Sequence, residues 1–415
     1  MPKVCVLALC LWAPASLSGY AVLSHEAVID AAWLDSIRPL LVKRFPDSTP
    51  EQLKAAHAYA YGGSIIQDMG YYPFGSKFFS NLVHYVRSGD FVAEMLSESQ
   101  DLNEYAFALG SLAHYCADNA GHAVAVNPSV ALTYPKLRAR YGAIVTYDED
   151  PPAHMKVEFG FDVLEVASDN YAPQAYHDFI GFEVSQRLLE SAFRKTYGLE
   201  MADIFVSLDL ALSTYRRTVS TILPEATKVA WRFQKDDIIR VRPGITKRRF
   251  LYNLSRSSYE REWGRQYRRP GLLARILSIV FRVIPKIGPF RDLAFKPPTQ
   301  QTSRLFMQSF NAALGRYRTA LEQQREGTLQ LSNLDCDTGR ATAPGEYRLA
   351  DQTYAKLART LAGNRFPYAT PEIAANVLAF FQDPNAPIST KRDKKQWRET
   401  QRAVAELKEW EASSR

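Results

Sequence analysis

The chain has 415 residues, of which 46% are hydrophobic and 23% are charged, and its formal net charge at pH 7 is +7. This is the composition of an ordinary globular protein, and the sequence shows neither an internal repeat nor a low-complexity tract, which excludes repeat arrays and disordered chains. The length suits one large domain or two modest ones. Helical periodicity dominates and alternating Val, Ile and Thr stretches are few, so we predict an all-α fold.

The N-terminus resembles a secretory signal. Residues 1–19 contain one early lysine, Lys3, then an apolar run from Val4 to Trp12, and then small residues. The run is too short to span a bilayer as a helix. We therefore expect a secreted or periplasmic protein, cleaved after Ser18 or after Gly19, with an uncleaved anchor as the alternative.

Two segments follow that place histidines near helix boundaries. In YAVLSHEAVIDAAW, residues 20–33, His25 lies near the start of a predicted helix. In QDMGYYPFGSKFFSNLVHYV, residues 67–86, Asp68 stands near a turn and His84 lies in an apolar, helix-like run.

The segment AHYCADNAGHAV, residues 113–124, spaces His114, Asp118 and His122 at every fourth position. On a helix these three side chains share one face, and the apolar stretch before them predicts that this face is buried. HMKVEFGFDVL, residues 154–164, repeats the spacing with His154 and Glu158. A hydrogen-bonded His–Asp pair in the core would explain one such pair, whereas imidazoles and carboxylates in this number indicate a site for several metal ions.

The order in which these histidines and carboxylates follow one another, from His25 to Glu158, resembles that in the zinc-dependent phospholipase C and P1-type nuclease superfamily. The resemblance covers roughly residues 20–200. Three residues separate Asp118 from His122, where members of the superfamily usually have five. This shorter spacing is similar to that in the catalytic domain of glycosylphosphatidylinositol-specific phospholipase D. The resemblance implies a multi-helix bundle that holds three zinc ions, here followed by additional C-terminal helices. The residues that correspond to the family's ligands are Tyr20, His25, Asp68, His84, His114, Asp118, His122, His154 and Glu158.

By the same resemblance, the ligands divide into three sets. The first zinc would be held by Asp68, His84, His114 and Asp118, and the second by His122, His154 and Glu158. The third would use His25, Asp118 as a bridge, and the new N-terminus at Tyr20, where tryptophan is common. Asp68 would be the general base or would orient the attacking water, with a role as ligand alone as the alternative.

Basic residues are concentrated between Arg232 and Lys296, where 17 Lys and Arg stand against 5 Asp and Glu. Residues 268–290 add an apolar stretch too short to cross a membrane, which fits a helix lying at an anionic lipid surface. A core helix and a basic nucleic-acid groove are the alternatives. We expect a catalytic domain over 20–231, this membrane-interacting segment over 232–300, and a C-terminal helical region over 301–415.

The C-terminal region contains helical patterns over residues 303–324, 347–363 and 370–383, and a charged tail that predicts an exposed helix. The loop over residues 326–347 shows no recognisable chemistry. Cys116 and Cys336 remain outside the signal, either as two buried thiols or as one disulfide.

The leading hypothesis is a zinc phosphodiesterase that hydrolyses phospholipids, with a phospholipase C-type cut favoured over a phospholipase D-type cut. No protein partner is indicated. A P1-type nuclease is the alternative, in which aromatic side chains near Asp68 would stack bases rather than fill the core: Tyr71, Tyr72, Phe74, Phe78 and Phe79. A third possibility is a non-catalytic, metal-stabilised membrane-binding protein.

Four further features receive smaller roles. We expect His57 to support the site by packing or by contacting a ligand residue rather than by binding metal itself, and we expect His177 to lie at the surface. Asp162 fits an acceptor for a ligand imidazole. Three glycines are expected to serve turns near Asp68 that let the backbone approach the site: Gly62, Gly63 and Gly70.

Overall fold

The computed structural model describes residues 22–162, 181–219 and 296–414, together with residue 164 and short pieces between 231 and 247. The predicted signal, the proposed ligand Tyr20, His177 and the basic apolar segment 268–290 lie outside the described residues.

The described residues form an all-α protein, as predicted. Their strands are a two-residue antiparallel pair, in which Leu334 of β1 (Leu334–Asp335) faces Ala341 of β2 (Arg340–Ala341). The helices before residue 220 are α2 (Val22–Ala32), η2 (Trp33–Ile37), α3 (Arg38–Arg44), α4 (Pro50–Ile65), η3 (Ile66–Tyr71), α5 (Lys77–Tyr85), α6 (Ser88–Glu98), α7 (Leu102–Gly121), η4 (His122–Val126), α8 (Asn127–Thr133), α9 (Pro135–Tyr141), α10 (Pro151–Phe161), α12 (Gln186–Tyr197), η6 (Met201–Asp203) and α13 (Leu208–Arg217). Those after residue 296 are α18 (Gln300–Glu326), α19 (Arg348–Gly363), α20 (Pro371–Phe380), η10 (Ser389–Arg392) and α21 (Lys394–Ser414).

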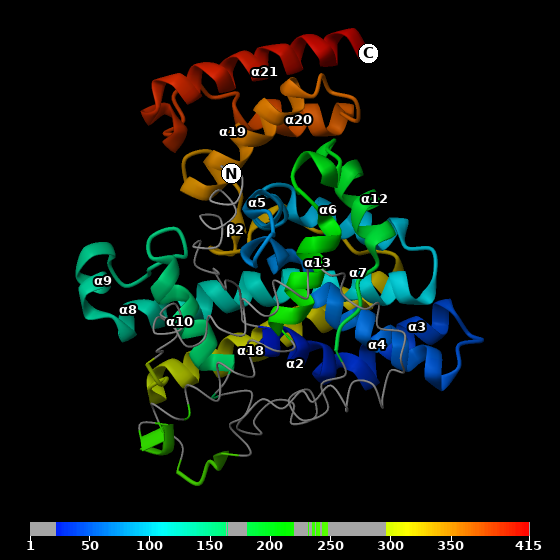
Figure 1. The fold of residues 1–415 in the computed structure, drawn as a ribbon, viewed down its shortest axis with the longest axis vertical. Helices are drawn as coiled ribbons and strands as arrows, with labels where there is room; N and C mark the ends of the chain where they lie inside the picture. The colour runs from blue at the N-terminus through cyan, green and yellow to red at the C-terminus, as the bar shows by residue number, and fades with distance from the viewer. Residues whose placement is uncertain are drawn as a thin grey trace, which may run out of the picture.

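Helix α7 lies at the centre of the bundle and is buried over nearly its whole length. It begins where the side chain of Asp101 accepts a hydrogen bond from the backbone N–H of Glu104, at 2.9 Å, which satisfies one of the free donors of the first turn. Helices α2, α4 and α18 pack against it (Figure 1). A single helix thus carries His114 and Asp118 through the middle of the core, with His122 directly after its last residue.

Glycines bring α4 and α7 unusually close together. A Cβ atom added to Gly63 would lie 1.9 Å from the carbonyl oxygen of Phe107, and one added to Gly110 would lie 2.1 Å from that of Ala60. Neither contact is possible for a larger residue, so backbone packs directly on backbone here. The expectation that Gly63 serves a turn was therefore wrong.

The other two glycines also permit close backbone contacts. A Cβ atom on Gly62, which also lies within α4, would fall 1.7 Å from the carbonyl oxygen of Glu183, so this glycine does not serve a turn either. Gly70 lies in the short helix η3 that carries Asp68, where a Cβ atom would fall 2.1 Å from the carbonyl oxygen of Ser76. At Gly70 the expected close approach of backbone near Asp68 is what the structure shows.

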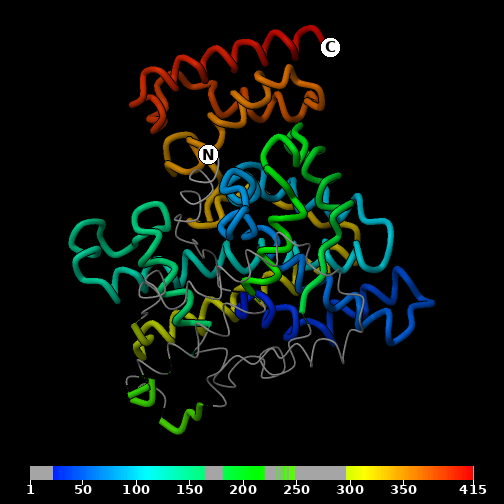
Figure 2. Tube along the Cα trace, in the orientation of Figure 1, coloured from blue at the N-terminus to red at the C-terminus, as the bar shows by residue number. Residues whose placement is uncertain are grey.

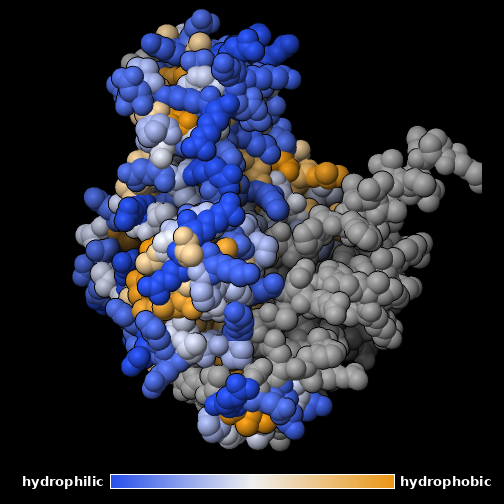
Figure 3. All heavy atoms as spheres, turned by 90° about the vertical axis from the view of Figure 1, so that its left-hand side faces the viewer, coloured by the Kyte–Doolittle hydropathy of each residue, from blue (hydrophilic) through white to orange (hydrophobic). Residues whose placement is uncertain are grey.

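The C-terminal region, residues 296–414, forms the helices predicted for it. Helix α18 packs along α7, where the hydroxyl of Tyr317 donates to the carbonyl of Leu109 at 2.9 Å. Helices α19, α20 and α21 form a separate layer at the top of the molecule (Figures 1 and 2). The surface of this layer is mostly hydrophilic in Figure 3, and α21 buries mainly Thr400, Ala403 and Leu407. Among the described helices, none combines the length and apolar character that a membrane span requires.

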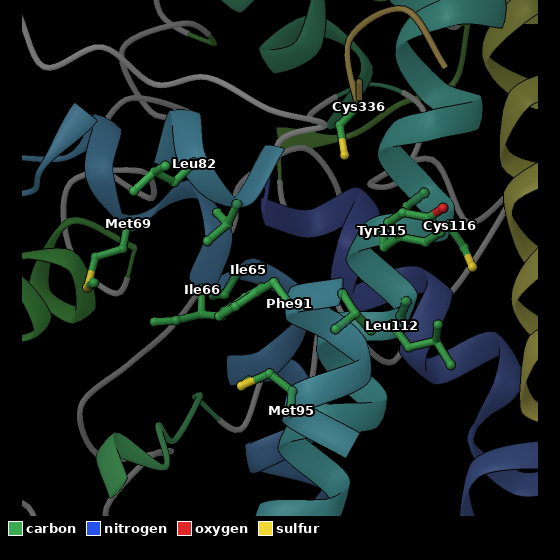
Figure 4. Packing of buried hydrophobic residues seen from close by; sticks show 14 of the residues in the cluster. Ile65, Ile66, Met69, Leu82, Phe91, Met95, Leu112, Tyr115, Cys116 and Cys336 are labelled. Atoms are coloured by element: carbon green, nitrogen blue, oxygen red, sulfur yellow. The ribbon is translucent and has the colours of Figure 1, made fainter. Parts of the chain in front are cut away.

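The hydrophobic core is continuous from α2 to α21 and fills the space around α7. Figure 4 shows part of it, with Leu112 and Tyr115 on α7 and Ile65 and Met69 close to Asp68 in the chain. Cys116 and Cys336 are both buried, free thiols, and they project on different sides of α7 (Figure 4).

Candidate metal centre

The first cluster consists of Asp68, His84, His114 and Asp118, which come from η3, α5 and α7. The Nε2 atoms of His84 and His114 lie 3.2 and 3.1 Å from Oδ2 of Asp118. Asp68 places its Oδ1 atom 3.5 Å from Nε2 of His84. All four side chains are buried, so they form one converging group of ligand-type atoms inside the bundle.

Backbone carbonyls orient both imidazoles of the first cluster. Nδ1 of His84 donates to the carbonyl of Ser80, one turn earlier in α5, at 2.7 Å. Nδ1 of His114 donates to the carbonyl of Ser64 at 2.8 Å, across the close glycine contact between α4 and α7. A proton on each Nδ1 leaves the lone pair of each Nε2 directed at Asp118 and Asp68, which is the arrangement of a metal-binding histidine.

His25 joins this cluster from α2. Its Nε2 atom lies 3.3 Å from Oδ1 of Asp118, and its ring stacks on that of His114 with centroids 4.3 Å apart. The start of α2 is fixed by Asp162, which accepts hydrogen bonds from the backbone N–H groups of Leu23 and Ser24 at 2.8 and 2.9 Å. Asp162 therefore caps the helix that carries His25; the expectation that it accepts from an imidazole was wrong.

The second cluster consists of His122, His154 and Glu158. Nε2 of His122 lies 3.5 Å from Oδ1 of Asp118 and 3.9 Å from Oε1 of Glu158. Nδ1 of His154 lies 2.8 Å from the same Glu158 oxygen, one turn along α10. Asp118 thus stands between the two clusters and places one oxygen towards each of them.

The converging atoms fit metal ions rather than a hydrogen-bonded network. Three groups bring their ligand atoms within 4.8 Å of one another: His25, His114 and Asp118; Asp68, His84 and His114; and His122, His154 and Glu158. Several of these buried atoms have no hydrogen-bond partner among the described residues, including both oxygens of Asp118, Nε2 of His122 and Oε1 of Glu158. Buried polar atoms without partners are costly, whereas nitrogen and carboxylate ligands at this spacing suit zinc. The structure therefore brings together all the predicted ligands that it describes.

The electrostatics show how strongly these buried groups interact with one another. Burial lowers the pKa of His84, but the close carboxylates of Asp118 and Asp68 outweigh burial and raise that pKa to about 10. Burial would raise the pKa of the Asp118 carboxyl, but the charges of His114 and His122 hold it well below its usual range. Burial also raises the pKa of Glu158. These shifts place perturbed acids and bases in one buried site, which is typical of functional centres.

Sequence reasoning missed Asp337, which lies in the loop between α18 and α19. Its Oδ1 atom lies 3.0 Å from Nδ1 of His122 and 3.5 Å from Nε2 of His154. The expectation that residues 326–347 carry no relevant chemistry was wrong, because this loop reaches the second cluster. No spacing rule could have located it, since 215 residues separate Asp337 from His122.

His57 lies outside the centre, as predicted. Its Nε2 atom is 3.0 Å from Oδ1 of Asp30, and its ring stacks on Trp33 with centroids 3.8 Å apart. The aromatic residues near Asp68 mostly fill the core: Tyr71, Tyr72, Phe78 and Phe79 are buried, whereas Phe74 is 41% exposed.

Comparison with known proteins agrees with this geometry. Residues 24–205 match the family model described as zinc dependent phospholipase C, and this range includes every described residue of both clusters. Searches of curated proteins and of solved structures gave no match. The match over residues 24–205 agrees with the resemblance to the zinc-dependent phospholipase C superfamily that the sequence predicted.

Proposed function

We propose that this protein is a zinc-dependent phosphodiesterase that hydrolyses phospholipids, with the phospholipase C-type cut that releases diacylglycerol. The observation that carries the proposal is the position of Asp118, whose two buried oxygens face histidines of both clusters. A carboxylate shared in this way can hold metal ions close together, which is the geometry that phosphodiester hydrolysis uses.

The proposed ligand sets follow the two clusters. Asp68, His84, His114 and Asp118 would hold one zinc ion, and His122, His154 and Glu158 a second. His25 and Asp118 would share a third ion with the N-terminus at Tyr20, which lies outside the described residues. When bound, the ions would lower the pKa of a bound water and neutralise the charge that develops on the phosphate.

The protein residues would orient the reactants around these ions. Asp68 lies at the edge of the first cluster, with its Oδ1 atom free of a hydrogen bond among the described residues. This oxygen could accept a proton from the attacking water or hold that water in place. Burial of the whole cluster excludes bulk water and strengthens each of these interactions.

The cellular setting is part of the same proposal. A signal over residues 1–19 would export the chain, and residues 268–290 would hold it at the surface of an anionic membrane. Both segments lie outside the described residues, so their support comes from the sequence pattern alone. Sedimentation with vesicles of rising anionic lipid content would measure the membrane contribution directly.

The nuclease alternative is less well supported. It requires exposed aromatic side chains near Asp68 to stack on bases, because stacking provides much of the affinity for single strands. Four of the five candidates are buried, and their rings pack in the core. Phe74 alone is exposed to a considerable extent.

The decisive experiment uses the full chain, loaded with zinc or stripped with a chelator, on mixed phospholipid vesicles. Products are identified by mass spectrometry. Zinc-dependent diacylglycerol supports the proposal, and phosphatidic acid would replace it with a phospholipase D-type cut. The activity should vanish in Asp118→Asn and persist in Glu322→Gln, a half-exposed carboxylate of α18 that pairs with Arg325. Absence of any lipid product from a zinc-loaded chain would contradict the proposal and turn attention to single-stranded nucleic acid.

A further inference from the structure

The loop between α18 and α19 is fixed against the helices of the metal centre. The backbone N–H of Cys336 donates to the carbonyl of His84 at 3.1 Å, and the hydroxyl of Tyr115 donates to the carbonyl of Ser332 at 2.8 Å. Figure 4 shows the Cys336 side chain directed into the packed interior, where the side-chain amide of Asn119 lies 3.8 Å from its sulfur. The loop is therefore held by α5 and α7, the two helices that carry His84 and His114.

This anchoring places the carboxylate of Asp337 where four polar groups surround its two oxygens. Its Oδ2 atom accepts hydrogen bonds from the backbone N–H of Tyr147 at 3.0 Å and from the hydroxyl of Tyr347 at 2.6 Å. Its Oδ1 atom is left for Nδ1 of His122 at 3.0 Å and Nε2 of His154 at 3.5 Å. The carboxylate is buried, so these four groups define its position.

Asn127 completes the arrangement on the other side of His154. Its side-chain oxygen lies 2.8 Å from Nε2 of His154, and its side-chain nitrogen donates to the backbone carbonyl of Asp337 at 2.8 Å. The amide therefore links the loop and the imidazole.

The contacts decide which nitrogen of each imidazole faces the cluster. With Nδ1–H of His122 donated to Asp337, the lone pair of Nε2 is directed at Asp118 and Glu158. With Nε2–H of His154 donated to Asn127, the lone pair of Nδ1 is directed at Glu158. A carboxylate behind a ligating histidine also increases the basicity of the ring, which strengthens metal binding.

We propose that Asp337 is a positioning residue of the metal centre, through which a region outside residues 24–205 holds the second cluster ready for zinc. The inference rests on the zinc centre proposed above. It does not depend on which phosphodiester is cleaved, because its direct consequence is metal affinity. The second cluster of this chain is then a joint product of the family-matched region and the C-terminal region.

The test measures zinc binding by the full chain in the native form and in Asp337→Asn, Asp337→Ala and Asp351→Asn. Asp351 is the matched control: it is a buried aspartate of the same region whose oxygens accept from the backbone of Gly345 and Ser389. Zinc stoichiometry is measured by elemental analysis and affinity by competition with a chelating dye. Circular dichroism checks that each variant is folded.

We expect Asp337→Ala to weaken the affinity for one zinc ion by about 10- to 100-fold, the usual effect of losing an acceptor behind a ligand histidine. Asp337→Asn should weaken it less, since the amide oxygen can still accept from Nδ1–H. The remaining ions should bind as in the native chain. Asp351→Asn should change zinc affinity less than about threefold, because its effect is confined to folding stability.

A spectroscopic measurement separates positioning from folding. With cobalt in place of zinc, Asp337→Asn should shift the visible absorption of one bound ion, whereas Asp351→Asn should leave the spectrum unchanged. Unchanged affinity and spectrum in folded Asp337→Asn would overturn the inference, as would equal losses in Asp351→Asn or a native chain that binds no zinc. A native chain that binds zinc but hydrolyses no phospholipid would contradict the proposed function alone.

Discussion

The two clusters of the metal centre hold their imidazoles in different ways. In the first cluster, His84 and His114 donate to backbone carbonyls of Ser80 and Ser64. In the second cluster, His122 and His154 rely on side chains, Asp337 and Asn127. A backbone carbonyl stays in place whatever the side chain at its position, whereas a side-chain acceptor can be removed by one substitution. The first cluster should therefore respond to changes in helix packing, and the second to single substitutions at a distance.

Asp118→Asn should have the largest effect, because this residue contacts both clusters. The amide has lost one of the two oxygens that face His114 and His122, and it has lost the negative charge that attracts a cation. We expect zinc to be lost from both clusters and phosphodiesterase activity to fall about a thousandfold or more, which corresponds to the several kcal/mol that metal ions contribute. Elemental analysis and the vesicle assay check both results.

Glu158→Gln provides the contrast to Asp118→Asn. Glu158 lies near His122 and His154 and is part of the second cluster alone. Its substitution should release one zinc ion and leave the first cluster loaded. Loss of all zinc from Glu158→Gln would mean that the clusters are not separable.

Gly63→Ala should disturb the first cluster through the fold. The new methyl group would lie 1.9 Å from the carbonyl oxygen of Phe107, so α4 must move away from α7 and carry the carbonyl of Ser64 away from His114. We expect a loss of about 2–3 kcal/mol in the free energy of unfolding, as for an overpacked core, and weaker binding of zinc in the first cluster. Urea unfolding and zinc titration measure the two effects.

Gly315→Ala is the matched control for Gly63→Ala. Gly315 lies inside α18, and a Cβ atom there meets no atom within 4 Å. Alanine should therefore stabilise the protein by about 0.5–1 kcal/mol, through the lower flexibility of the unfolded chain. A similar loss of stability in both variants would show that the close contact between α4 and α7 is not the cause.

The contrast between the clusters also explains what the sequence could and could not predict. Residues four positions apart lie on the same face of any helix, so the sequence pattern alone located two sets of ligands: His114, Asp118 and His122, and His154 and Glu158. The C-terminal helices were found in the same way from their periodicity. Asp337 has no such local signature, because its role arises only when a loop after α18 folds against α5 and α7.

The same limit applies to Asp162 and to Gly63. The spacing after Glu158 placed Asp162 on the ligand helix, but its partner turned out to be the N-terminus of α2, a contact between residues 138 positions apart. The glycines were recognised as positions of close backbone approach, yet the approaching backbone was a whole helix rather than a turn. In each case the residue type was informative and the partner was set by tertiary packing.

Asp162→Ala should have an intermediate effect, confined to the start of α2. Removal of the carboxylate leaves the backbone N–H groups of Leu23 and Ser24 without their acceptor in a buried position. We expect a loss of about 1–2 kcal/mol in the free energy of unfolding, as for other helix caps. Urea unfolding measures this loss, and hydrogen exchange at Ser24 should increase more than exchange within α7.

The pH dependence of Asp162 provides a second measurement. Burial raises the pKa of this carboxyl from 3.8 to about 7, so the native chain binds a proton that the unfolded chain has released. Stability from this group is therefore present below pH 3.8 and is lost as the pH rises to about 7. The stability difference between the native chain and Asp162→Asn should fall over this range; a constant difference would contradict the assignment.

Arg348→Ala should have the smallest effect, although Arg348 also joins the C-terminal region to the rest of the bundle. Its guanidinium forms two contacts of 2.7 Å with the carboxylate of Asp148. Arg348 directly follows Tyr347, whose hydroxyl donates a hydrogen bond to Asp337. The side chain is 54% exposed, so solvent and salt screen the pair, and we expect a loss of less than about 1 kcal/mol that shrinks as salt is added. Zinc affinity should stay within about twofold of the native value, since the buried contacts of Asp337 remain. A loss of zinc as large as in Asp337→Asn would mean that the second cluster depends on docking of the whole region rather than on one carboxylate.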